Sequence, residues 1–150
     1  MIAVVGPGDA VVDPSVLAAA EQVGRLLAEA GHQVVTGGLG GVMAAAAHGA
    51  RAVGGTVVAL LPGDDPAVAH DDSDVVVATG LGQGRNVLLV RSAAAVIAVG
   101  GSWGTLSEVA LARRLGKPVV WLHGWAVDGP DDPVPTAATA EEAVALVLAG

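Results

Sequence analysis

Residues 94–108 read AAVIAVGGSWGTLSE, an apolar run that leads directly into a glycine-rich turn and then into a helix-type pattern. Short apolar runs bounded by turn residues are typical of buried strands in parallel sheets. The same order of strand, turn and helix recurs along the chain. We therefore predict an α/β fold, namely a Rossmann-like, doubly wound parallel sheet of about six strands with helices on both faces.

The other predicted elements continue this alternation. Asp13 and Pro14 have the pattern of an N-cap and first helical residue, and Thr139 with Glu142 forms a capping box for the last helix. Residues 128–138 are predicted to be a surface loop, and residues 1–150 a single nucleotide-binding domain. The predicted strands are 2–5, 33–36, 56–61, 74–78, 94–99 and 118–122, and the predicted helices begin near 14, 42, 85, 105 and 140, the last ending near 148.

Composition excludes several classes of function. The chain has no cysteine, which rules out disulfides, thiolate metal sites and a cysteine nucleophile. Its formal net charge of −8 leaves no basic patch for a nucleic-acid partner. The most apolar uncharged stretch, residues 92–107, is too short to span a membrane, and the N-terminus lacks a signal-peptide layout. We expect a cytoplasmic protein with no nucleic-acid and no membrane partner.

Many glycines lie directly after predicted strands. In a parallel sheet these turns share the carboxyl edge, where open α/β sheets bind ligands. Glycine lets backbone N–H groups approach a phosphate, and the next helix adds its positive dipole. The alternative is that tight turns simply favour glycine; because four turns share the pattern, we predict a phosphate-bearing ligand. The glycines concerned are Gly6, Gly8, Gly37, Gly38, Gly40, Gly41, Gly80, Gly82, Gly84, Gly100, Gly101 and Gly104.

Three better-known motifs do not fit. The dinucleotide fingerprint fails at Val11, where its third glycine belongs, and the chain has no Gly-Lys-Ser/Thr of a P-loop. Residues 100–104 match the G-x-S-x-G elbow of serine hydrolases, but Glu108 is the sole carboxylate between Ser102 and the only later histidine, His123. NAD, P-loop and serine-hydrolase chemistry are therefore disfavoured.

Residues 100–108, GGSWGTLSE, resemble the PGGxGTxxE signature of the LOG family of cytokinin riboside 5′-monophosphate phosphoribohydrolases, whose bacterial relatives were long labelled lysine decarboxylases. Residues 36–43, TGGLGGVM, are similar to the family's earlier glycine loop, and residues 84–86, GRN, match its helix arginine. The resemblance covers residues 1–122 and is to a short bacterial branch with GG-x-WGTLSE. It implies a nucleoside 5′-monophosphate ligand, a homodimer and no metal or redox cofactor.

The resemblance also implies roles for individual residues. Arg85 and Glu108 correspond to the family's catalytic arginine and glutamate, and residues 101–105 to its phosphate loop. A carboxylate can stabilise an oxocarbenium-like centre and position water, while arginine offers a permanent bidentate charge. The expected phosphate- and nucleotide-binding residues are Gly6, Gly8, Gly37, Gly38, Gly40, Gly41, Gly101, Ser102, Trp103, Gly104 and Thr105.

Simpler explanations stay open for some of these residues. Thr105 and Glu108 have the spacing of a capping box, Arg85 fits a solvated helix face, and Trp103 fits either stacking on a base or ordinary packing. Lys117 lies in a turn at the opposite edge, which argues against a pyridoxal Schiff base. No metal site is predicted, because the histidines lack ligand spacing and the loop aspartates fit solvated carboxylates: His32, His48, His70, His123, Asp71, Asp72 and Asp74.

Three departures from the family pattern affect the functional prediction. The signature proline is Gly100 here, the second glycine is Ser102, and the lysine that follows the arginine in plant-type members is Asn86. Two functions stay open: a phosphoribohydrolase that releases a free base and ribose 5-phosphate, and a non-catalytic nucleotide or molybdenum-cofactor binder. The alanine-rich stretch of residues 43–47 fits close helix packing, either between subunits of a homodimer or within one chain.

Overall fold

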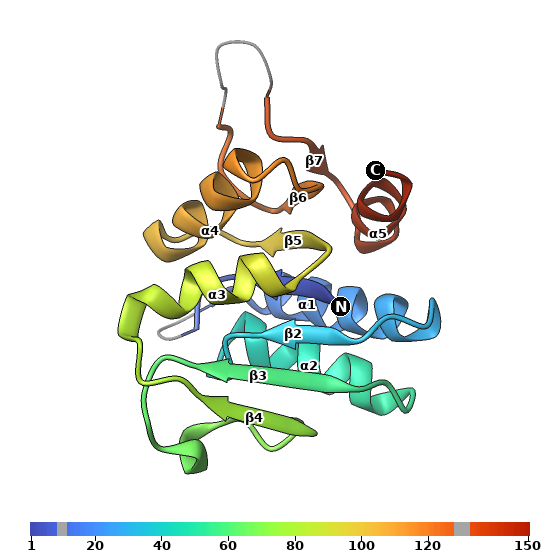
Figure 1. The fold of residues 1–150 in the computed structure, drawn as a ribbon. Helices are drawn as coiled ribbons and strands as arrows, with labels where there is room; N and C mark the ends of the chain where they lie inside the picture. The colour runs from blue at the N-terminus through green and yellow to red at the C-terminus, as the bar shows by residue number, and fades with distance from the viewer. Residues whose placement is uncertain (9–11, 128–132) are drawn as a thin grey trace.

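The computed structural model describes residues 1–8, 12–127 and 133–150. These residues form one parallel sheet of seven strands in the order β4-β3-β2-β1-β5-β6-β7 (Figure 1). The fold is α/β and Rossmann-like, as the sequence predicts. The strands are β1 (Ile2–Val5), β2 (Val34–Thr36), β3 (Val57–Leu61), β4 (Val75–Ala78), β5 (Ala95–Val99), β6 (Val119–Leu122) and β7 (Thr136–Ala137). The helices are α1 (Pro14–Glu29), α2 (Val42–Ala52), α3 (Arg85–Ser92), α4 (Trp103–Arg114) and α5 (Ala140–Ala149), with 3-10 turns η1 (Pro66–Val68) and η2 (Gly82–Gly84).

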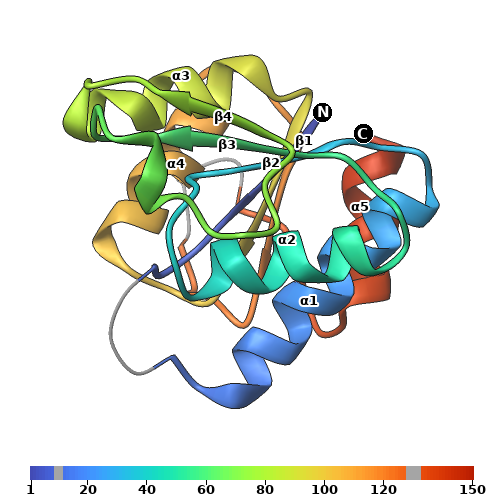
Figure 2. The same ribbon diagram turned by 90° about the horizontal axis from the view of Figure 1, so that it is seen from below.

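Helices cover both faces of the sheet, as Figure 2 shows: α1, α2 and α5 lie on one side, and α3 and α4 on the other. Alternate strand residues supply the two cores, so that Val4 of β1 faces α1 and α2 while Val5 faces α3 and α4. The strands β1, β5 and β6 are buried along their whole length, as expected for a parallel sheet covered on both faces. Among the described helices, none is long and apolar enough to cross a membrane.

Two elements differ from the sequence prediction by more than one residue. Residues Thr136–Ala137, placed in the predicted loop, form the edge strand β7 beside β6; a two-residue strand has no periodicity to detect. Helix α4 begins at Trp103 rather than Thr105, because the Ser102 side chain accepts a hydrogen bond from the Thr105 N–H at 3.1 Å and caps the helix. Residues 128–132 of the predicted loop lie outside the described part of the chain.

Helices α1 and α2 pack with their backbones in contact. A Cβ atom on Gly24 of α1 would overlap the main-chain carbonyl of Ala46, and one on Gly49 of α2 would overlap that of Glu21. Both positions therefore need glycine because there is no room for a side chain. Ala46 and Ala47 are completely buried in the same core. Of the two kinds of packing predicted for residues 43–47, the structure shows the one within a single chain.

Replacing Gly24 with alanine is expected to lower the free energy of unfolding by about 1–3 kcal/mol, because the methyl group would force two helices apart. Glycine-to-alanine changes inside helices normally stabilise by about 0.5–1 kcal/mol, so the expected sign is reversed. The matched control is Gly104→Ala in α4, where the added Cβ would lie 3.7 Å from its nearest neighbour, the Ser102 Oγ. Urea unfolding measures both variants, and a Gly24→Ala protein as stable as the wild type would contradict the close packing.

The order of the strands places a crevice between β1 and β5. From β1 the chain builds outward through β2, β3 and β4, and then crosses back to form β5 on the other side of β1. The connections that leave the carboxyl ends of β1 and β5 turn to opposite faces of the sheet, which is where doubly wound folds bind ligands. The glycine-rich turns at residues 6–8 and 100–102 begin at this point.

Candidate functional site

A pocket of about 410 Å³ opens at the carboxyl edge of the sheet. It brings together turns that follow β1, β2 and β5 and the first residues of α3 and α4. Eight of the residues predicted for the site line this pocket: Gly6, Gly8, Gly37, Arg85, Ser102, Gly104, Thr105 and Glu108. The two predicted catalytic residues therefore face the same space, although they belong to different helices.

Five other predicted residues do not line the pocket. Gly38 is buried and donates its N–H to the Thr36 Oγ1 at 3.1 Å, and Gly40 and Gly41 form the rest of the turn that leads into α2. Gly101 lies against Trp125, and Trp103 extends into solvent. These residues shape the turns around the pocket instead of contributing to its wall.

The first turn of α4 presents backbone donors to the pocket. The Ser102 side chain and carbonyl accept the N–H groups of Thr105 and Leu106. The N–H groups of Trp103 and Gly104 come before the first hydrogen bond within the helix and lie at the positive end of its dipole, and Gly104 lines the pocket. Because Ser102 is the N-cap, Glu108 lies in the second turn and the capping-box interpretation of Thr105 and Glu108 is wrong.

Arg85, the first residue of α3, is buried and not on a solvated helix face. Its Nη1 donates hydrogen bonds to the carbonyls of Gly37 and Leu60, each at 2.5 Å, and its Nε donates to the Asn86 Oδ1 at 3.1 Å. The guanidinium thus ties the ends of β2 and β3 to α3. Loss of hydration lowers the pKa of Arg85, an effect that the nearby Glu108 opposes. Arg85 also lines the pocket, and no hydrogen bond of its Nη2 to another described residue is found.

Glu108 is a buried carboxyl group with a raised pKa. Burial raises its pKa from 4.5 to about 7, and the positive charge of Arg85 acts in the opposite direction. The two groups interact electrostatically but do not form a direct salt bridge. At neutral pH this side chain is therefore divided between its acidic and basic forms, a property suited to proton transfer.

Five residues of the pocket wall are not among those predicted from the sequence. Val5, Leu39 and Met43 add apolar wall, and Gln83 and Asn86 add polar groups. Asn86 accepts from Arg85 and donates its Nδ2 to the Ser107 Oγ at 3.4 Å, which connects α3 to α4. A signal was present for Asn86, because it stands where plant-type LOG members carry the lysine that follows the arginine.

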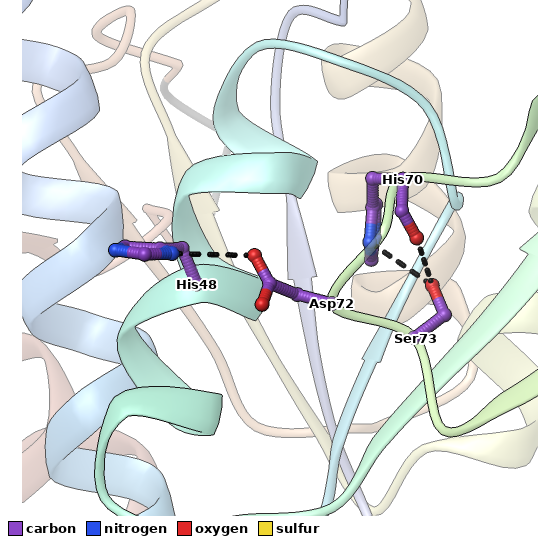
Figure 3. Close-up of polar contacts among 4 residues, drawn as sticks. All are labelled: His48, His70, Asp72 and Ser73. Carbon is purple, nitrogen blue, oxygen red and sulfur yellow. Dashed lines mark hydrogen bonds and ion pairs between the residues drawn. The ribbon is translucent and has the colours of Figure 1, made fainter.

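His70 stabilises the turn after β2, which borders the pocket. The Ser73 Oγ donates to the His70 carbonyl, so it accepts from the ring Nδ1 at 3.0 Å (Figure 3). The ring Nε2 then accepts the Thr36 hydroxyl at 3.1 Å, and the same hydroxyl oxygen accepts the Gly38 N–H. Desolvation lowers the pKa of His70, against the nearby charges of Asp72 and Asp71, which favours the neutral ring that this network requires. A surface or packing role was predicted for His70, and the structure gives it this more specific one.

Other residues considered from the sequence have structural roles. His48 of α2 pairs with Asp72 at 3.2 Å (Figure 3), and Arg51 pairs with Asp74 at 3.0 Å. The Lys117 ammonium donates to the main-chain carbonyls of Ala93 and Arg91 at the end of α3. Within the described residues, no group of histidine, aspartate and glutamate side chains is arranged to hold a metal ion.

The turn after β5 has a backbone that the LOG signature would not allow. Gly100, at the position of the family's proline, has φ of +69°, whereas proline is fixed near −65°. The Gly100 carbonyl accepts a hydrogen bond of 2.5 Å from the Trp121 indole. This turn therefore depends on a tryptophan of β6, a feature that the nine-residue motif does not include.

Comparison with known proteins identifies the family. The model of the SLOG cluster4 family matches residues 1–147. The chain belongs to this family. A protein of Archaeoglobus fulgidus is 46% identical to it over 121 residues, which cover 81% of this chain and 78% of that protein. The predicted resemblance is thus confirmed for the broader SLOG and LOG type of Rossmann-like protein, while the phosphoribohydrolase branch is not.

Solved structures of two related proteins match this SLOG cluster4 chain over nearly its full length. The molybdenum cofactor binding protein of Rippkaea orientalis is 36% identical with a TM-score of 0.89, and the match covers 99% of this chain and 94% of that one. The molybdenum cofactor carrier protein of Chlamydomonas reinhardtii is 35% identical with a TM-score of 0.86, and the match covers 99% of this chain and 98% of that one. The relatives thus favour the binding alternative over hydrolysis.

Proposed function

We propose that this SLOG cluster4 protein binds and carries a phosphorylated pterin cargo of the molybdenum-cofactor type. The observation that carries the proposal is its likeness, over 99% of the chain, to proteins named for binding or carrying that cofactor. The pocket at the carboxyl edge of β1 and β5 supports it, because its donors suit the anionic part of such a molecule.

The residues of the pocket fit the phosphate of this cargo. The free N–H groups at the start of α4 and the Arg85 guanidinium are the two kinds of donor that proteins use for phosphate. Ser102 and Thr105 add hydroxyl groups beside them. The chain has no cysteine, so it supplies no thiolate to molybdenum. The metal would therefore be held by the cargo itself, as suits a carrier that must release it.

The test is to identify what the purified protein retains. Protein produced in a host that makes molybdenum cofactor is expected to release a pterin that is fluorescent after acid oxidation, together with phosphate. Arg85→Met should retain much less of it, since the variant lacks the guanidinium. Retention of equal pterin by both proteins would contradict the proposed site, and a nucleotide in place of pterin would contradict the cargo.

A second function, hydrolysis of the N-glycosidic bond of a nucleoside 5′-monophosphate, is favoured by one observation. Glu108 is a pocket carboxyl with a pKa of about 7, close to Arg85, which is the combination that the LOG resemblance assigns to catalysis. A panel of nucleoside monophosphates, assayed for free base and ribose 5-phosphate, tests it. Turnover that Glu108→Ala abolishes would support hydrolysis, and no release from any of them would remove it. A homodimer and the absence of a nucleic-acid partner remain predictions.

A further inference from the structure

We propose that Trp103 is the stacking surface for the planar ring of the ligand, an inference that rests on the proposed function and deepens it. Trp103 is 79% exposed, the most exposed large apolar side chain among the described residues. Tryptophan normally lies largely buried, so ordinary packing does not explain this position. Its chain neighbours Ser102 and Gly104 both line the pocket, so the backbone of Trp103 lies at the edge of the pocket.

The three aromatic side chains of the chain lie together beside the turn after β5. The sequence contains three tryptophans and neither tyrosine nor phenylalanine. Trp103 meets Trp125 nearly edge-on, with ring centroids 5.1 Å apart and planes at 74°. The ring centroid of Trp125 in turn lies 6.2 Å from that of the fully buried Trp121, whose indole N–H donates a hydrogen bond to the Gly100 carbonyl. The exposed indole is thus supported through two further rings by the turn that borders the pocket.

The position of Trp125 also depends on the absence of a side chain at Gly101. A Cβ atom on Gly101 would lie 2.5 Å from the Trp125 Nε1 and 2.8 Å from its Cδ1, so only glycine lets Trp125 rest on the turn. An edge-on contact holds an aromatic ring at a defined angle while much of it stays accessible. Trp103 is therefore oriented by its neighbours but not covered by them.

A planar heterocycle fits this surface better than other occupants do. A single indole is far smaller than the roughly 1,000 Å² that a stable protein interface needs. The net charge of −8 opposes a nucleic-acid strand. A ligand with phosphate on the α4 N–H groups and a fused ring beside it would use both features of the same helix end. Stacking of such a ring on an aromatic side chain typically strengthens binding about 5- to 150-fold.

Two probes separate the ring from the phosphate. Guanosine 5′-monophosphate carries a purine with the same amino and oxo pattern as a pterin, and ribose 5-phosphate carries no ring. Calorimetry on the wild type is expected to show tighter binding of the nucleotide. In Trp103→Ala the preference for the nucleotide should fall about 5- to 150-fold, while the affinity for ribose 5-phosphate should not change. Trp103→Phe should keep most of the preference for the nucleotide. Thermal unfolding of both variants verifies that they fold, as expected for an exposed residue.

The outcomes distinguish this inference from the function on which it rests. If both probes bind and Trp103→Ala keeps the preference for the nucleotide, or weakens both probes equally, the stacking role is overturned while the phosphate site stands. If neither probe binds the wild type, the proposed ligand site fails and the stacking role fails with it. If Trp103→Ala changes the oligomeric state in light scattering and leaves both affinities as they were, the indole belongs to an interface between copies, which also overturns the proposal.

Discussion

The Arg85→Met variant is expected to lose about 3–5 kcal/mol of unfolding free energy, because three buried acceptors lose their donor at a cost of at least about 1 kcal/mol each and the buried Glu108 loses a nearby positive charge. The guanidinium donates to Gly37 and Leu60 at the ends of two strands and to Asn86 on its own helix, and all three bonds disappear with it. Glu108 loses the one cation that favours its ionised form, so its pKa should rise further. Urea unfolding at neutral pH measures the loss.

Two further variants show whether the loss comes from the buried pair. Arg114→Met removes an exposed arginine from the last turn of α4, where a cation is worth about 0.3–1 kcal/mol. In an Arg85→Met/Glu108→Gln protein the loss should be smaller than for Arg85→Met alone, because no buried carboxylate is left without its cation. If Arg85→Met were no less stable than Arg114→Met, the role of Arg85 as a structural tie would be wrong.

Replacing Glu108 with glutamine is expected to remove a pH dependence of stability. In the folded protein the pKa of Glu108 is about 7, against 4.5 as its ordinary value, so between these values the folded state holds more protons than the unfolded state. Stability from this group is therefore present at low pH and is lost as the pH rises through 7. The full difference corresponds to about 3 kcal/mol. We expect the wild type to lose this amount relative to Glu108→Gln between about pH 4 and pH 8.

The comparison between these two proteins cancels other titrating groups. His70 acts in the opposite sense, because its pKa is lowered from 6.5 and its contribution is lost as the pH falls. That contribution is the same in both proteins. The matched control is Glu29→Gln, which removes an exposed carboxyl from α1 and should follow the wild-type curve. Parallel curves for the wild type and Glu108→Gln would show that burial does not shift this carboxyl.

The fold could be predicted from the sequence because its signals are local. The apolar run before Gly100 and the Asp13-Pro14 pair at the start of α1 each identify an element within a few residues. The two-residue strand β7 could not be predicted in this way. Its position follows from pairing with β6 and from the hydrogen bond between the Trp121 N–H and the Pro135 carbonyl, which are tertiary contacts.

The pocket could be predicted only in part for the same reason. Arg85 and Glu108 were selected by a resemblance, and no pattern in the sequence indicates that they meet. The start of α4 was misplaced because Ser102 and Thr105 are both good caps; the structure shows Ser102 in that role and Thr105 as its donor. The contact among the three tryptophans also depends on the order of strands, which brings β6 beside β5.

The hydrogen bond between His70 and Thr36 shows that residues outside the pocket wall help to fix the shape of the pocket. His70 lies in the segment between β3 and β4, which contributes no residue to the pocket wall, yet its ring bonds the residue that fixes the Gly38 turn. A substitution at position 70 is therefore expected to alter the Gly38 turn without replacing any residue of the pocket wall. The segment that contains His70 is thus a place where the shape of the pocket can change while its wall keeps the same residues.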